Sequence, residues 1–370
     1  MSIYDAGLQK LPAFCSLQED IRTGRLPAAV TGLGHIHKTL WMHALHTMLH
    51  RRTVLLVADE AEATRMQEDL TALGERVLML PARDLSLRQV ESTSREYEQL
   101  RLGTLANMAE GRYDCVIASV DAALQYTLSP DTLLQRTLDL QAGTALPVKD
   151  LAAAFTAAGY ERATQIEGAG QFAIRGGIVD IYPAASTQPI RIELWGDTVD
   201  TISYFDRITQ RRTDQIDSIS IPPAAEIMYD DGAMLATKIA ALAASLRGRD
   251  VEKQRESLLR DVERLRSGRY PASLDKYIPL IYPQPACFFD YCSDSLLFVS
   301  EIGKIRERSR TFHWQLQEDI KGLIAEGELC RGLMEFALPR DMLHRNLQDR
   351  RNTSTILRPN INHHFQGDVW

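Results

Sequence analysis

The sequence lacks the features that mark membrane, secreted and disulfide-stabilised proteins. None of its apolar runs approaches the ~18 uncharged residues that a bilayer span requires, and the N-terminal MSIYDAGLQK has no basic-then-apolar signal-peptide pattern. The five cysteines are odd in number, widely spread and form no CxxC pair, so they are predicted to be reduced packing residues rather than a zinc site or a redox dithiol. These absences predict a cytoplasmic protein with no membrane partner.

An excess of basic charge is also missing. The chain has 42 Lys and Arg against 49 Asp and Glu, a formal net charge of -7 at pH 7. Because such a chain as a whole repels phosphate, nucleic acid is not expected to be its main partner. The mixed charges at 246–269 recur at helical spacing, which favours a salt-bridged exposed helix over a DNA-contacting stripe.

What the sequence does contain is the material for two or three globular domains. It has 370 residues, of which 45% are hydrophobic and 25% are charged. Residues 1–130 alternate apolar strands with helical periodicity, which predicts an α/β unit with a parallel sheet. Residues 131–222 predict a small α+β unit, with one helix beside a largely antiparallel sheet. The pattern is helical again over 223–330, with mixed charges at helical spacing from Ala236 to about Arg269, and the polar residues 331–370 predict a connector.

The segment TGLGHIHKT, residues 31–39, lies where a phosphate-binding loop belongs, after an apolar strand and at the start of a helix. Gly32, Lys38 and Thr39 match the pattern GxxxxGK[ST], but His37 replaces the second glycine. That glycine lets successive N–H groups face the phosphates, and an imidazole there would crowd them. We therefore predict a degenerate nucleotide loop, with a strand-to-helix turn and a leftover lysine favoured over a working ATP site.

No convincing acidic partner for Mg²⁺ accompanies this loop. The apolar strand that ends near residue 119 is followed only by Asp121, without a second acid. Asp59 and Glu60 follow another strand, but acids at the start of a helix explain them better. The sequence therefore predicts neither ATP nor Mg²⁺ as a cofactor of this chain.

Other candidate catalytic and metal-binding side chains have simpler explanations. His43, His46 and His50 share one helix face, opposite an apolar face of Trp41, Ala44, Leu45 and Met48. A solvated face is favoured over a metal site because no carboxylate or fourth ligand lies at matching spacing. A set of carboxylates falls on outward strand positions or turns, where acids are ordinary: Asp180, Glu193, Asp197 and Asp200. No residues are therefore assigned to catalysis or to a metal.

The strand IRIELWG presents the best candidate for a binding surface. Its alternation places Ile190, Ile192 and Leu194 on one side, and Arg191, Glu193 and Trp195 on the other. An arginine and a tryptophan side by side on the water-facing side are typical of protein–protein hot spots. Arg175 precedes the Gly-Gly turn and should point outward beside them. The patch predicted to bind a protein is Arg175, Arg191 and Trp195, although Trp195 covering a neighbouring strand residue is equally compatible with the spacing.

The long segment GQFAIRGGIVDIYPAASTQPIRIELWGDTVDTISYFDRITQRR resembles the signature that UvrB shares with the N-terminal module of the transcription-repair coupling factor Mfd. A weaker resemblance extends over residues 1 to about 330. It favours the coupling factors, because UvrB keeps a complete phosphate loop and a tyrosine-rich DNA-gripping hairpin, neither of which is found here.

This resemblance implies a P-loop NTPase-like α/β domain, split between 1–130 and 223–330 and interrupted by a UvrA-binding domain. It implies that Arg175, Arg191 and Trp195 contact UvrA, with Trp195 replacing the more frequent Phe. It also implies that ATP hydrolysis with Mg²⁺, and the contacts with DNA and RNA polymerase, belong to motor domains absent from this chain. A C-terminal domain masks the UvrA surface in the resting family members, so constitutive UvrA binding is expected here. The alternative is an ATP-dependent damage-recognition subunit of the UvrB type.

Overall fold

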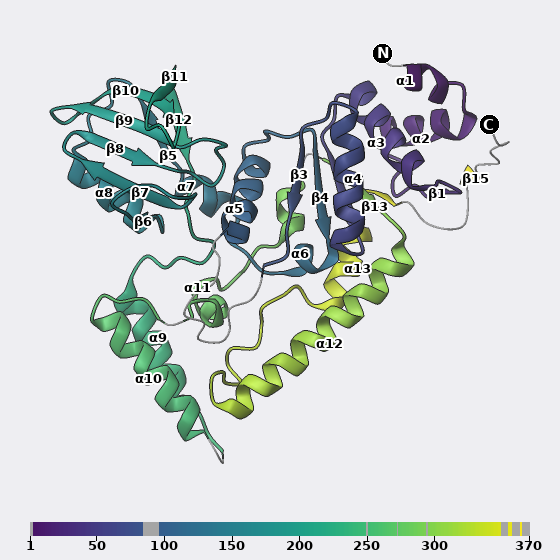
Figure 1. The fold of residues 1–370 in the computed structure, drawn as a ribbon. Coiled ribbons are helices and arrows are strands. Elements are labelled where there is room, and N and C mark those ends of the chain that lie inside the picture. The colour runs from purple at the N-terminus through teal and green to yellow at the C-terminus, as the bar shows by residue number, and fades with distance from the viewer. Residues whose placement is uncertain are drawn as a thin grey trace.

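A computed structural model of the chain describes residues 3–83, 96–248, 251–271, 273–293, 295–348, 354–356 and 363–364. Two sheets organise these residues, one parallel and one mostly antiparallel, each covered by helices (Figure 1). Much of the predicted connector at 331–370 lies outside the described residues. No helix in the described ranges combines the length and the apolar character that a bilayer span requires.

The first sheet is parallel throughout its five strands, which lie in the order β14-β13-β2-β4-β3. The strand bounds are β2 (Thr53–Val57), β3 (Val77–Leu80), β4 (Cys115–Ser119), β13 (Leu296–Val299) and β14 (Ser354–Ile356). A short parallel pair, β1 (Val30–Thr31) with β15 (His363–His364), lies outside this sheet. The residues of β2 and β4 are buried on both faces, as expected for a parallel sheet between two helical layers.

Successive residues of these strands enter different cores. Val54 and Leu56 belong to a large core, whereas Leu55 and Val57 belong to a second core on the opposite face. The second core is covered by α2 (Pro12–Arg22), α3 (His35–Leu49) and α4 (Glu60–Ala72), and α1 (Ile3–Leu8) contacts α3. Figure 1 shows α4 and α5 on opposite sides of the sheet.

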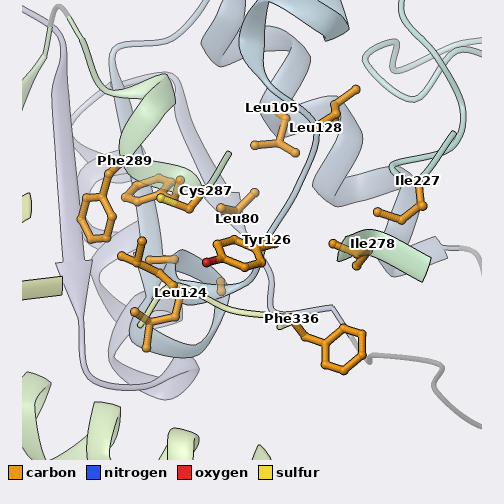
Figure 2. Close-up of a cluster of buried hydrophobic side chains, with 14 of the residues drawn as sticks. Leu80, Leu105, Leu124, Tyr126, Leu128, Ile227, Ile278, Cys287, Phe289 and Phe336 are labelled. Atoms are coloured by element: carbon orange, nitrogen blue, oxygen red, sulfur yellow. The ribbon is translucent and has the colours of Figure 1, made fainter. Parts of the chain in front are cut away.

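The large core contains helices that precede the second sheet in the chain and helices that follow it. Its helices are α5 (Glu96–Ala109), α6 (Val120–Leu124), α7 (Pro130–Gln135), α9 (Gly232–Ser245), α10 (Glu252–Arg266), α11 (Ile278–Ile281), α12 (Ile302–Glu326) and α13 (Arg340–Gln348), with 3-10 turns η1 (Asp275–Tyr277) and η2 (Phe288–Tyr291). Figure 2 shows side chains of this core, among them Leu124, Tyr126 and Phe289, gathered in one cluster. The segments before and after the second sheet thus share one apolar interior.

The stretch of helical spacing from Ala236 to about Arg269 does not form one continuous helix. The chain instead forms a hairpin in which α9 and α10 lie side by side (Figure 1). Helix α9 ends at Ser245, and Gly248 has a φ of 124°, a left-handed value that a continuing helix cannot contain. Helix α10 is also more than a salt-bridged exposed helix, since Leu258, Val262 and Leu265 are buried in the large core.

The second sheet has six strands in the order β11-β10-β9-β8-β7-β6, antiparallel except for the β6–β7 pair. The bounds are β6 (Glu161–Arg162), β7 (Gln171–Arg175), β8 (Ile178–Ile181), β9 (Ile190–Trp195), β10 (Thr198–Phe205) and β11 (Arg212–Ile216). Helix α8 (Val148–Ala157) packs on it through Leu151 and Phe155. An antiparallel ladder of β5 (Leu138–Gln141) with β12 (Ser218–Ile221) joins the two ends of this unit.

A buried ion pair attaches the returning chain to the first unit. Arg101 of α5 and Glu226, which follows β12, are both 0% exposed, and Arg101 Nε lies 3.0 Å from each carboxylate oxygen. Arg101 Nη1 also donates to the carbonyl oxygen of Pro81 at 2.9 Å. Burial disfavours the charged carboxylate, but the charges of Arg101 and Arg83 outweigh it and lower the pKa of Glu226. The interaction fixes the point where the chain leaves the second sheet.

Replacing one partner of this pair should destabilise the fold strongly. We expect Arg101→Met to lower the free energy of unfolding by about 3–5 kcal/mol, because Glu226 stays buried without its counter-charge. Lys321→Met removes an exposed partner of Glu318 and should cost less than about 1 kcal/mol. Urea unfolding followed by circular dichroism measures both. The double variant Arg101→Met/Glu226→Leu should recover much of the loss, and a single variant as mild as the control contradicts this role of the pair.

Candidate functional site

Strand β9 divides the second sheet into a buried face and an outer face. Its apolar side chains pack with α8 in a separate core that includes Ile190, Ile192 and Leu194. The alternating side chains, Arg191, Glu193 and Trp195, lie on the other face and are partly or fully exposed. The two-residue period of the strand therefore determines which side chains can meet a partner.

A buried aspartate binds both predicted arginines on this outer face. Asp180 of β8 is 2% exposed. Arg191 donates to it through Nε at 2.7 Å and Nη2 at 3.0 Å, and Arg175 donates through Nη2. Strand register brings them together, because Asp180 pairs with Arg191 on one side and with Ala173, two residues before Arg175, on the other. One carboxylate between two guanidinium groups leaves one net positive charge in the cluster.

Arg191 is further fixed from the β10–β11 turn. Its Nη1 donates to the Gln210 carbonyl oxygen at 3.1 Å, and its guanidinium carbon lies 4.6 Å from the centre of the Phe205 ring. The hydrogen bonds to Asp180 raise the pKa of Arg191, so its charge is maintained at every physiological pH. Its side chain is 11% exposed. The guanidinium is therefore held in one place before any partner arrives.

Trp195 contrasts with Arg191 in being almost fully open to solvent. It ends β9 and pairs with Thr198 across a hairpin that contains Gly196 at a φ of 61°. Its exposed fraction is 84%. Single exposed apolar residues are common on protein surfaces, but an indole this exposed offers a large contact area to a partner.

The three residues of the predicted patch differ in their exposure to solvent. Trp195 does not cover a neighbouring strand residue, while Arg191 is mostly covered and Arg175, with a side chain 48% exposed, is the more accessible arginine. The reason is the buried carboxylate of Asp180, which draws both guanidinium groups down onto the sheet. The patch thus combines an anchored basic cluster with a projecting aromatic ring.

The loop at residues 31–39 lies at the start of α3, and other side chains of the protein bind its lysine. Lys38 Nζ lies 2.8 Å from Glu301 Oε1 and donates to Ser300 Oγ at 3.0 Å. Ser300 in turn donates to Glu62 at 2.7 Å. Gly32 has a φ of 80°, whereas His37 is exposed, and Thr39 Oγ1 donates to the Ile36 carbonyl oxygen at 2.7 Å. The ammonium group of Lys38 is therefore bound by side chains of the protein.

The acids considered as Mg²⁺ partners also have structural roles. Asp59 is the N-cap of α4 and accepts a hydrogen bond from the Glu62 backbone at 2.9 Å, as expected for a helix-starting acid. Asp121, in the first turn of α6, is paired with Arg308 of α12. Asp59 therefore caps its own helix, and Asp121 joins α6 to α12.

The prediction that the three histidines of α3 face solvent is wrong for two of them. The side chains of His43 and His46 are 13% and 21% exposed, and only His50 is exposed. The cause is Glu75, a buried residue between α4 and β3, whose Oε1 lies 2.6 Å from His43 Nδ1. The helical projection of α3 could not include a carboxylate that comes from another element.

Sequence reasoning missed several residues of these sites. The prediction that Asp180 is an ordinary outward carboxylate is wrong, since it is 2% exposed and accepts hydrogen bonds from two arginines. Its usable signal was the position between Val179 and Ile181, because an aspartate inside a β-strand is unusual and requires a partner when buried. Gln210 and Glu301 gave no comparable signal, because each has a positive φ in a connection and meets its partner only in the folded chain. The basic cluster and the lysine environment are thus tertiary features.

Comparisons with known proteins agree with the second sheet as a distinct unit. The family model of the UvrB interaction domain matches residues 138–227, a range that begins with β5 and ends after β12. The matched range contains Arg175, Asp180, Arg191 and Trp195, so the outer-face patch belongs to this family's domain.

Over most of its length the chain is similar to transcription-repair-coupling factors. It is 31% identical over 331 residues to that of Bacillus subtilis, covering 86% of this chain and 28% of the relative. Identity to the factor of Staphylococcus haemolyticus is 24% with 80% and 26% covered, and to that of Haemophilus influenzae 26% with 67% and 21% covered. The chain spans about a quarter of the length of these relatives. It is therefore related to the transcription-repair-coupling factors, and its residues 138–227 are a UvrB interaction domain.

Proposed function

We propose that this chain is a docking module that recruits UvrA, the damage-recognition protein of nucleotide excision repair, and catalyses no reaction itself. The observation that carries the proposal is the outer face of the second sheet, where Trp195 is 84% exposed beside arginines fixed by Asp180. Recruitment would place UvrA at lesions where RNA polymerase has stalled. ATP hydrolysis and the contacts with DNA and polymerase would belong to other domains of a longer protein.

The physical basis of the docking is preorganisation. An exposed indole contributes large apolar area on binding, and a guanidinium contributes directional hydrogen bonds, which is why both residue types dominate interface energies. Arg191 is already held by Asp180, Gln210 and Phe205, so little side-chain entropy remains to be lost when a partner binds. The net positive cluster would suit an acidic group on UvrA.

The patch can be tested by two single substitutions. We expect Trp195→Ala and Arg191→Ala each to weaken UvrA binding at least about thirtyfold, or ~2 kcal/mol, the loss typical of a hot-spot residue. Isothermal titration calorimetry of purified UvrA with each variant measures the affinity.

The matched control is Trp314→Ala, which removes an exposed tryptophan of α12 that is 61% exposed but lies outside the second sheet. It should leave the affinity unchanged. Thermal unfolding should show that Trp195→Ala retains the fold, since its side chain lies in solvent. Unchanged UvrA binding in both test variants would defeat the assignment of the site.

We also propose that this chain neither binds nor hydrolyses ATP, on the basis of the loop at residues 31–39. Lys38 is held by Glu301 and Ser300, and His37 stands where a phosphate loop needs glycine. We expect a titration with ATP and Mg²⁺ to give no saturable binding, and Lys38→Ala to leave that result unchanged. Micromolar affinity that disappears in Lys38→Ala would instead support an ATP-dependent subunit of the UvrB type.

A further inference from the structure

Three side chains from distant parts of the chain converge at the edge of the parallel sheet where its strands begin. His46 lies in the last turn of α3, Glu75 precedes β3, and Asp114 immediately precedes β4. Each offers one ligand atom, and these atoms all lie within 4.8 Å of one another. His46 Nε2 is 3.5 Å from Glu75 Oε2 and 4.0 Å from Asp114 Oδ1.

The protonation of His46 is constrained by its other ring nitrogen. Nδ1 lies 2.8 Å from the carbonyl oxygen of Arg51. Because a carbonyl oxygen only accepts, Nδ1 must carry the proton, and Nε2 of the neutral ring then holds a lone pair. In the neutral ring that lone pair faces two carboxylate oxygens, and the repulsion is removed either by a proton on Nε2 or by a metal ion bound between the three groups. A histidine that donates one N–H to a backbone carbonyl while the other nitrogen faces the site is also how metal-binding histidines are oriented.

Glu75 supplies an independent indication of a missing partner. Its side chain is 3% exposed. Oε1 lies 2.6 Å from His43 Nδ1, whereas Oε2 has no hydrogen bond from any residue that the structure describes and points toward His46. A buried carboxylate oxygen left without a partner is costly. A bound cation at this point would satisfy it.

The spacing suits a small transition-metal ion. Ligand bonds of ~2.0–2.2 Å in a tetrahedral site put neighbouring ligand atoms about 3.3–3.6 Å apart. The two separations from His46 Nε2, 3.5 and 4.0 Å, need to change by only a few tenths of an ångström, and the Glu75 and Asp114 oxygens, which lie within 4.8 Å of each other, must also approach to this range. His46 and Asp114 also line an open cavity of about 590 Å³ together with His50 and Tyr113, which gives an ion access and leaves a coordination position for water.

We infer that His46, Glu75 and Asp114 form a binding site for one divalent transition-metal ion of the zinc class, with a fourth position open to solvent. One imidazole with two carboxylates favours zinc, manganese or iron over the all-oxygen sites of calcium and magnesium. Arg76 hydrogen-bonds both oxygens of Asp114 and keeps it ionised, while its own charge weakens the attraction of the ion. The bound ion would join α3 to the starts of β3 and β4.

The inference is tested by zinc binding to the chelator-treated chain, measured by competition with a chromogenic zinc indicator. We expect one equivalent of Zn²⁺ to bind, with affinity at least tenfold lower in His46→Gln and in Glu75→Gln, since each removes a direct ligand. The control is His37→Gln, an exposed histidine at the other end of the same helix, which should bind as the unaltered chain does. Zinc should also raise the thermal midpoint of the unaltered chain and the control, but not of the two ligand variants.

A measurement on the unaltered chain tests the inference even if the variants fail to fold. Nitrogen-15 NMR of the histidine side chains should show the His46 Nε2 resonance shifting on addition of one equivalent of Zn²⁺. Absence of stoichiometric binding, binding that His46→Gln leaves unchanged, or a His46 ring found doubly protonated and insensitive to Zn²⁺ would each overturn the inference.

Discussion

The outer face of the UvrB interaction domain depends on one buried carboxylate. Asp180 is 2% exposed and accepts hydrogen bonds from both Arg175 and Arg191. A buried charge is tolerated only when it is paired and hydrogen-bonded, and here the pairing also positions two cationic groups on the surface. Without this carboxylate the guanidinium groups would be long, mobile side chains, and binding would have to order them. The proposed docking function therefore rests on an interaction that the partner itself would scarcely touch.

Around the parallel sheet, the side chains considered for nucleotide chemistry are bound by other groups of the protein. Lys38 and Glu301 are 263 residues apart along the chain, yet their side chains meet beside the loop that opens α3. Asp59 caps α4, and Asp121 pairs with Arg308. Lys38 and Asp121 thus join separate elements, whereas Asp59 caps the helix that it begins. At the opposite end of the strands, where they begin, the side chains of His46, Glu75 and Asp114 come together.

A strand ladder and a few buried side-chain interactions connect the two units. The β5–β12 ladder closes the second unit where the chain enters and leaves it, and the Arg101–Glu226 pair then anchors the returning segment to α5. Gln99 adds a hydrogen bond from its Nε2 to the Ala224 carbonyl oxygen at 2.7 Å. Because these contacts lie at the junction, the patch around Trp195 is carried on a unit whose base is fixed rather than on a free linker.

Local periodicity in the sequence was enough to predict the features that repeat along a strand or a helix. Alternation in β9 separated Ile190 and Ile192 from Arg191 and Trp195, and the apolar strands between helical segments predicted the parallel sheet. The α9–α10 hairpin was not foreseen, because mixed helical spacing continues through the turn near Gly248. The pairing of charged and polar groups became visible only in the folded chain: Asp180 with two arginines, Glu301 with Lys38, and Glu75 with His43. Those pairs join elements that are separate in the sequence, and a pattern that repeats every two or four residues carries no information about such distant partners.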